Sequence, residues 1–113
     1  GRKSACHWAW GQYLPLFGAE WVQERTVFDG NIITAGGVTS GIDFAFRVLE
    51  HLHGADVAAT IRLALEYDPE QHEGGTPATA RPEMVANVRA ITAQRLGHRD
   101  AEMRAAAARL MGE

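Results

Sequence analysis

The sequence predicts an α/β fold whose helices carry more apolar surface than its own strands can cover. Two observations predict this class: a clear β-hairpin signal over residues 21–34, and about five segments with helical spacing or composition. Two or three strands cannot form the central sheet that so many apolar helix faces require. We therefore expect that other residues supply further strands, or that the helices pack on a partner.

The first part of the chain is expected to hold a short strand, a helix and the hairpin. Residues 3–7 are a candidate strand, and residues 8–17 have apolar side chains at helical spacing, closed by Gly18. Residues 21–34 are rich in β-branched and aromatic side chains and are interrupted by Asp29-Gly30. This pair predicts a tight turn, because both central positions of such a turn need positive φ.

A helix is predicted over residues 40–53, where Thr39 or Ser40 can cap its start and Gly54 ends it. One continuous apolar stripe runs along it, and further apolar residues lie off that stripe. We therefore expect a sheet on one side of this helix and another element on the other. The stripe comprises Ile42, Ala45, Phe46, Leu49 and Leu52.

The rest of the chain predicts three helices and one long loop. A helix starts near Asp56 and ends near residues 67–69, and residues 70–81 hold the Gly and Pro residues typical of a loop. Pro82 suits the first turn of the next helix, which breaks at Gly97 and is followed by an Ala-rich helix over residues 99–111. The residues of the Pro82 helix expected to face inward are Met84, Val88, Ile91 and Leu96.

Composition is that of one ordinary globular domain and excludes several classes of protein. The chain has 11 Lys and Arg against 14 Asp and Glu, a formal net charge of −3, and 46% hydrophobic residues. A mildly acidic chain lacks the basic face that nucleic acid requires, and no apolar run reaches the ~18–20 residues of a membrane span. The single cysteine, Cys6, excludes a disulfide scaffold and fits a reducing compartment. Because the chain opens on Gly1 without Met, we expect it to begin partway through a longer protein.

The adjacent pair Cys6 and His7 is the first candidate for chemistry. Neighbouring residues on a strand point to opposite faces, so the two are not expected to work as a pair. We interpret Cys6 as a small buried packing residue. His7 lies at an expected strand end, where ligand-facing residues of α/β sheets collect. It either faces a pocket or is a hydrogen-bonded structural histidine, and both interpretations stay open.

The glycine-rich run of residues 36–41 leads from a strand into the start of a helix. Its free N–H groups and the helix dipole could stabilise an anion. It is neither a Walker loop nor a dinucleotide fingerprint. The alternative interpretation is a tight connection that simply needs glycine.

Other polar and aromatic residues are given structural interpretations. His51 and His53 are two apart on a helix and cannot share a metal from one face, so no metal site is expected. Asp43 and Glu66 are interpreted as charges at helix ends rather than as acids of a site. The tryptophans assigned to the core or to an interface are Trp8, Trp10 and Trp21.

Four blocks of sequence then occur in a fixed order: residues 1–8, Asp29-Gly30-Asn31, residues 34–45 and Leu65-Glu66-Tyr67-Asp68-Pro69. Together they resemble the C-terminal half of the ThiJ/PfpI superfamily, which shares the class I glutamine amidotransferase-like fold, and within it the isonitrile (cyclohexyl-isocyanide) hydratases. The resemblance implies that residues 1–113 are the C-terminal half of a single domain. That domain is a three-layer α/β/α sandwich with a mostly parallel sheet, here with the β-hairpin and, over residues 79–113, a C-terminal helical extension.

The resemblance also implies a cytoplasmic, homodimeric lyase that uses no cofactor and no metal. Its cysteine nucleophile and assisting acid are expected upstream of Gly1, so this segment alone should be inactive, and Cys6 does not match the nucleophile. Hydratases tend to carry a Pro-Pro-Phe-like segment where this chain has Glu70-Gln71-His72, so a pocket wall or lid is expected to differ there. The residues that the resemblance places along the active site are His7, Gly36, Gly37, Val38 and Thr39.

The reaction implied by the resemblance is hydration of an isonitrile to an N-substituted formamide, through attack of a thiolate on the terminal carbon. The expected partners are the N-terminal half of the same domain, a second copy of the protein and a small-molecule substrate, with no nucleic acid and no membrane. Three alternatives stay open. They are a ligand-sensing domain of an AraC-type transcription regulator, a superfamily protein with protease, deglycase or chaperone-like activity, and a non-catalytic interaction fragment.

Overall fold

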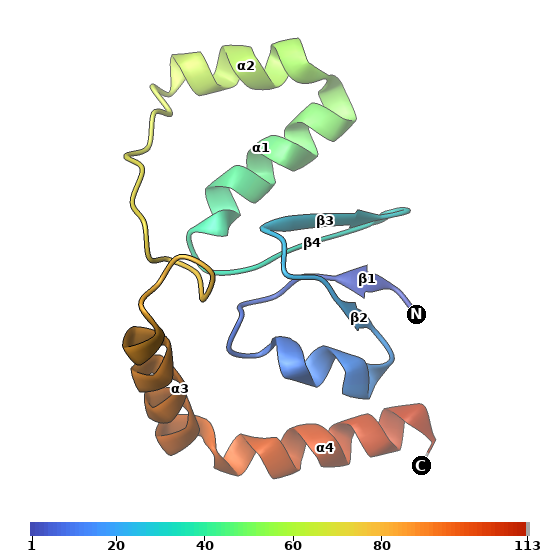
Figure 1. Cartoon of the computed structure of the whole chain (residues 1–113). Helices are drawn as coiled ribbons and strands as arrows, with labels where there is room; N and C mark the ends of the chain where they lie inside the picture. The colour runs from blue at the N-terminus through green and yellow to red at the C-terminus, as the bar shows by residue number, and fades with distance from the viewer. Residues whose placement is uncertain (113) are drawn as a thin grey trace.

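The computed structural model describes residues 1–112 and confirms the α/β class. Two small two-stranded sheets lie between helices (Figure 1). Helix α1 lies beside the hairpin with α2 packed on α1, and the 3₁₀ helix η1 lies beside the other sheet with α4 packed on η1. The elements are β1 Lys3–Ser4, η1 Gly11–Phe17, β2 Glu20–Trp21, β3 Thr26–Asp29, β4 Ile32–Ala35, α1 Ser40–His53, α2 Ala55–Ala64, α3 Pro82–Leu96 and α4 His98–Met111.

Strand β1 is shorter than the expected strand over residues 3–7, and it pairs in parallel with β2. On the other side of β1, side chains of the hairpin, rather than backbone carbonyls of a strand, accept hydrogen bonds from the backbone of this segment. The Lys3 N–H donates to Asp29 Oδ2 at 2.7 Å, and the Ala5 N–H donates to Thr34 Oγ1 at 2.9 Å. These bonds hold β1 between β2 and the hairpin, and they leave His7 in the connection beyond the strand end.

The α-helix expected over residues 8–17 is wrong in type and start, because the chain forms the 3₁₀ helix η1 from Gly11. In an α-helix the Pro15 ring would clash with the carbonyl four residues earlier, at Gly11, which disfavours the α form in this segment. Gly18 adopts the expected left-handed conformation, with φ of 75°. Gly11 lies under the Trp21 indole, where an added Cβ would come within 1.8 Å of Trp21 Cε2.

The predicted hairpin is confirmed over β3 and β4, but its expected first residue, Trp21, pairs with β1 instead, and its turn lies one residue later than expected. Asp29 pairs with Ile32, so the two turn residues are Gly30 and Asn31. Of these two turn residues, only Gly30 has a positive φ, which is 62°. A positive φ at the first turn residue alone is the pattern of a type II′ turn. Asp29 instead closes the ladder and uses its carboxylate to hold β1.

Helix α1 starts and ends where the sequence predicts, but neither predicted cap makes a side-chain cap bond. The Ser40 hydroxyl donates backward to the Gly37 carbonyl at 2.6 Å instead. On the apolar stripe, Phe46 is buried, whereas Ile42 is 58% and Leu52 is 66% exposed. Part of the stripe therefore remains without a cover among residues 1–112.

Helix α2 ends in a Schellman motif at the Leu65-Glu66-Tyr67 block. The Glu66 N–H donates to the Leu63 carbonyl at 3.1 Å, and the Tyr67 N–H donates to the Arg62 carbonyl at 2.9 Å. Glu66 adopts φ of 51°, a left-handed conformation in which glycine is the usual residue. This turn directs Tyr67 back toward α1.

Helices α3 and α4 form the C-terminal part of the chain. Helix α4 packs on η1, and the Tyr13 hydroxyl donates to Asp100 Oδ1 at 3.1 Å. The expectation that one face of α3 points inward is wrong for three of its four residues, whereas Leu96 is half-buried. Met84, Val88 and Ile91 are 43%, 41% and 48% exposed.

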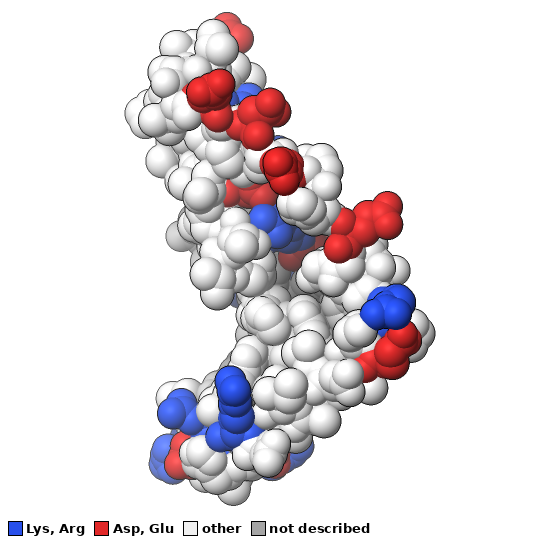
Figure 2. All heavy atoms as spheres, turned by 90° about the vertical axis from the view of Figure 1, so that its left-hand side faces the viewer, with Lys and Arg blue, Asp and Glu red and all other residues white. Residues whose placement is uncertain are grey.

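The chain does not close an interior by itself, as the surplus of apolar helix surface predicts. No large side chain within residues 1–112 is fully buried. The radius of gyration is 16.8 Å, against about 13 Å for a compact domain of this length, and the molecule measures 47 × 36 × 19 Å. Figure 2 shows the bent outline, with acidic side chains over the upper part, where α1 and α2 lie, and most Lys and Arg over the lower part. None of the described helices has the length and apolarity to cross a bilayer.

Candidate functional site

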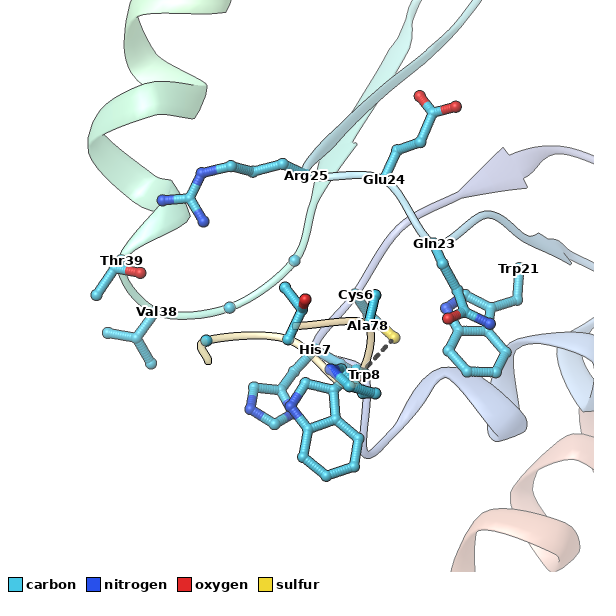
Figure 3. A pocket seen from close by; sticks show the side chains of 15 residues that line it. Cys6, His7, Trp8, Trp21, Gln23, Glu24, Arg25, Val38, Thr39 and Ala78 are labelled. Carbon is cyan, nitrogen blue, oxygen red and sulfur yellow. Dashed lines mark hydrogen bonds between the residues drawn. The ribbon is translucent and has the colours of Figure 1, made fainter. Parts of the chain in front are cut away.

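A cavity of about 420 Å³ lies where the connection after β1, the end of β4 and the start of α1 meet (Figure 3). Its size suits a small organic molecule. It brings together all the residues that the sequence placed along a site, and we keep their functional role as a proposal. Those residues are His7, Gly36, Gly37, Val38 and Thr39.

The glycines of the loop have a conformational reason. An added Cβ at Gly36 would lie 2.5 Å from the Cys6 carbonyl oxygen, so the end of β4 approaches the backbone of the neighbouring segment closely. Gly37 has φ of 83°, which disfavours any residue with a Cβ. The interpretation of residues 36–41 as a tight connection that needs glycine is therefore confirmed, and the same loop also lines the cavity.

The expected anion site at the start of α1 is weaker than the sequence indicates. The N–H groups of Ser40 and Gly41 donate to the carbonyls of Gly37 and Val38, each at 3.2 Å. These two donors are thus occupied by the chain's own backbone, because the segment that leads into the helix is already a tight turn. The Val38 side chain at this position is 95% exposed.

Cys6 is half-buried and lines the cavity, so the expectation of a fully buried packing cysteine is wrong in its burial. Its Sγ donates to the His7 carbonyl at 3.4 Å. Burial raises the pKa of the Cys6 thiol. A thiol with a raised pKa that donates to a carbonyl is a poor nucleophile near neutral pH, because the thiolate is the reactive form.

His7 combines the two interpretations that the sequence left open. It lines the cavity, and its Nδ1 accepts a hydrogen bond from the Ala9 N–H at 3.2 Å. Its ring stacks on Trp8 with 5.6 Å between centroids. Because Nδ1 is an acceptor, the neutral ring carries its proton on Nε2.

Asp43 is part of a network rather than only a charge at the start of a helix. Its Oδ2 accepts from Arg25 Nε at 2.6 Å, and its Oδ1 accepts from the Tyr67 hydroxyl. The Tyr67 hydrogen bond and the Arg25 ion pair together lower the pKa of Asp43, and the bond to Asp43 raises the pKa of Tyr67. Beside the cavity lies an open groove that contains Asp43 and Tyr67. Glu66, the other acidic candidate, lines neither the cavity nor this groove.

The pocket wall expected at residues 70–72 is formed instead by residues 75–78. Glu70 and His72 contact each other at 3.2 Å on the surface. Residues 74–80 are folded by their own hydrogen bonds, from the Gly74 N–H to Thr79 Oγ1 at 3.2 Å and from the Ala80 N–H to the Thr76 carbonyl at 2.8 Å. The signal that could have found this wall is the spacing of the two threonines after a pair of glycines.

Of the tryptophans and histidines that remain, some line the cavity and others pack elsewhere in the fold. Trp8 and Trp21 line the cavity, whereas Trp10 contacts Tyr13 with 5.9 Å between ring centroids. His51 contacts the Phe28 ring at 5.3 Å. Across residues 1–112, no group of three or more His, Cys, Asp or Glu side chains is placed to hold a metal ion. Arg25 and its two neighbours on the cavity wall, Gln23 and Glu24, were not among the predicted site residues.

Comparison with known proteins gives concordant matches. Residues 1–51 match the DJ-1/PfpI family. The chain is 40% identical over 111 residues to an isonitrile hydratase from Pseudomonas putida, which covers 97% of this chain and 49% of that protein. It superposes on the crystal structure of a ThiJ/PfpI family protein from Pseudomonas syringae with a TM-score of 0.74 and 31% identity, covering 94% of this chain and 43% of that one. The chain thus spans about half the length of the curated relative that it matches. The match over residues 1–51, the 40% identity and the structural superposition all relate the chain to the DJ-1/PfpI family.

Proposed function

We propose that this chain forms one wall of the active site of an enzyme that hydrates isonitriles to N-substituted formamides. The observation that carries the proposal is the gathering of His7 and residues 36–39 around one cavity, in a chain 40% identical to an isonitrile hydratase. The cavity is large enough for a small isonitrile, and its tryptophans offer apolar surface to an N-substituent.

The nucleophile in this proposal is a cysteine from another segment of polypeptide, the N-terminal half of the same domain. The raised pKa of Cys6 and its bond to the His7 carbonyl argue against this thiol as the nucleophile. Exposed apolar residues at the start of α1, with Val38 95% and Ile42 58% exposed, offer a surface for that other half. We expect the complete domain to bury them, because burial of apolar area is the dominant favourable term in association.

The chemistry proceeds in two balanced steps. The thiolate attacks the terminal carbon of R–N≡C and that carbon gains a proton, which gives the thioimidate R–N=CH–S. Water then adds its oxygen to the same carbon, one of its protons goes to the nitrogen, and the C–S bond breaks to return the thiolate. The second proton of the water replaces the proton consumed in the first step. The product is R–NH–CHO, so the net change is addition of one water without oxidation or reduction.

Among the residues of this chain, His7 is the one best suited to transfer a proton or to orient the attacking water. The Ala9 N–H occupies Nδ1, which leaves Nε2 as the ring atom able to hydrogen-bond a bound molecule.

We further propose that the enzyme is a homodimer in the cytoplasm. Sedimentation of the complete protein tests the oligomeric state.

The test uses the protein encoded by the complete gene. We expect it to convert cyclohexyl isocyanide to N-cyclohexylformamide, measured by liquid chromatography and mass spectrometry, whereas residues 1–113 alone should yield no product above buffer. Cys6→Ser in the complete protein should lose less than about tenfold in kcat, since loss of a true nucleophile costs about 10⁴-fold or more. Binding of the isonitrile without turnover would favour a ligand sensor instead and contradict the proposal.

A further inference from the structure

We propose that Arg25 determines substrate specificity by binding a carboxylate on the N-substituent of the isonitrile, and that Asp43 and Tyr67 hold it in position. This inference rests on the proposed function and names the substrate class of that same cavity. The substrates that it selects are isonitriles whose substituent ends in an anionic carboxylate, rather than purely apolar ones.

Arg25 stands between two hollows of the molecule. It lines the 420 Å³ cavity, and it also lines an open groove of about 580 Å³ that contains Asp43 and Tyr67. Figure 3 shows its side chain extending from the segment before β3 toward the start of α1, which Thr39 precedes. A group bound in the cavity can therefore meet the guanidinium, while the groove holds the residues that anchor it.

Only one part of the guanidinium is used by the protein. Within residues 1–112 the hydrogen bonds of the Arg25 side chain run through Nε, which donates to Asp43 Oδ2 at 2.6 Å. The two terminal amino groups remain, and this edge of a guanidinium matches the two oxygens of a carboxylate in a bidentate pair. The side chain is 52% exposed and thus open to a ligand.

Asp43 and Tyr67 restrict Arg25 to this position. The Tyr67 hydroxyl donates to Asp43 Oδ1, and the Tyr67 ring contacts Phe46 with 4.8 Å between centroids. The left-handed Glu66 turn sets the direction of Tyr67, which explains why this block at the end of α2 matters to the cavity. A guanidinium that is already held loses less side-chain entropy when it binds a ligand.

The rest of the cavity makes a carboxylate the fitting ligand group for Arg25. Arg25 is the one Lys or Arg among the described residues that line the cavity. The other charged lining residue, Glu24, extends away from His7 and Trp8 in Figure 3. A substrate with its apolar part against Trp8 and its carboxylate at Arg25 would satisfy both kinds of surface.

The chain contains a matched control. The Tyr13 hydroxyl donates to Asp100 Oδ1 at 3.1 Å, and Arg104 Nε donates to Asp100 Oδ2 at 2.8 Å, which repeats the arrangement of Tyr67, Asp43 and Arg25. This second set joins α4 to η1 and lines neither hollow. Tyr13→Phe therefore removes an equivalent hydrogen bond without affecting the proposed carboxylate site.

The experiment compares kcat/KM for isocyanoacetate and for cyclohexyl isocyanide in the complete protein. Arg25→Met should lower the ratio of kcat/KM for isocyanoacetate to kcat/KM for cyclohexyl isocyanide by about 10- to 100-fold, the range for loss of a charged hydrogen-bond pair. Tyr67→Phe should raise KM for isocyanoacetate by about threefold to tenfold with little change in kcat, and Tyr13→Phe should leave the ratio unchanged. Arg25→Lys should restore part of the ratio, since it keeps the charge but not the fork.

The outcomes separate the two proposals. Hydration of cyclohexyl isocyanide with a ratio that Arg25→Met does not change would overturn the role of Arg25 and leave the proposed function standing. Equal effects of Tyr67→Phe and Tyr13→Phe would overturn the positioning role of Tyr67. Turnover of neither isonitrile by the wild-type protein would overturn both the proposed function and this inference.

Discussion

Replacing Gly36 with alanine should destabilise the protein through a contact between two backbone segments. The added Cβ would lie 2.5 Å from the Cys6 carbonyl oxygen and 3.0 Å from the Cys6 carbonyl carbon. Neither atom belongs to a flexible side chain, so the end of β4 must move away from the segment after β1. Overpacking of this kind costs typically about 1–3 kcal/mol. The movement would also widen the cavity wall that holds Cys6 and Gly36.

Thermal unfolding of the complete protein, with Gly41→Ala as the matched control, measures this effect. Gly41 lies in the first turn of α1, and an added Cβ there would meet nothing within 4 Å. Alanine at Gly41 should therefore raise stability by about 0.5–1 kcal/mol through helix propensity. For a chain of about 150–250 residues, Gly36→Ala should lower Tm by roughly 2–12 °C, and Gly41→Ala should raise it slightly. A Gly36→Ala protein as stable as the Gly41→Ala protein would refute the close approach that we describe.

Three further predictions concern single positions. Gly11→Ala places a Cβ 1.8 Å from Trp21 Cε2, so it should cost about 1–3 kcal/mol, measured by urea unfolding, and should increase the solvent exposure of tryptophan detected by fluorescence quenching; unchanged stability would contradict the packing of η1 on β2. Glu66→Gly should stabilise the protein by up to about 1 kcal/mol, since glycine adopts φ of 51° without the penalty of a Cβ, and a loss of stability would argue against the Schellman turn. The pKa of Asp43 in the folded protein is lowered from its ordinary 3.8, so the carboxylate stabilises the fold above that pH and this contribution is lost as pH falls through the folded pKa. Asp43→Asn should therefore cost more stability at pH 6 than at pH 3 in urea unfolding, and an equal cost at both pH values would count against the network.

Elements whose signals are local could be predicted from the sequence. Helix α1 begins at Ser40 and stops before Gly54, and α3 begins at Pro82, as expected. Helix-ending glycines, helix-starting prolines and apolar spacing act over a few residues, so their effect does not depend on the remainder of the fold. The turn at Gly30 was placed one residue early because the register depends on which residue closes the ladder, and Asp29 is held there by its bond to the Lys3 N–H.

The candidate site was predicted only in part. Its loop residues belong to one short run, and the resemblance marks them directly. The wall at residues 75–78 and the guanidinium of Arg25 come from other parts of the chain. No local pattern near Arg25 indicates that it meets α1. The wall was expected at residues 70–72 only because the resemblance implied a difference there.

The sequence by itself determined where most helices begin and end, that the fold is of the α/β class, and that its helices carry more apolar surface than it can cover. These properties follow from residue types and their spacing within a few turns of chain. Only the tertiary structure decided that Tyr67 reaches Asp43 across 24 positions and that Arg25 reaches it across 18. Such contacts depend on how α1 packs beside the hairpin and α2 packs on α1, because hydrogen-bond geometry requires a fit of a few tenths of an ångström that sequence spacing does not specify.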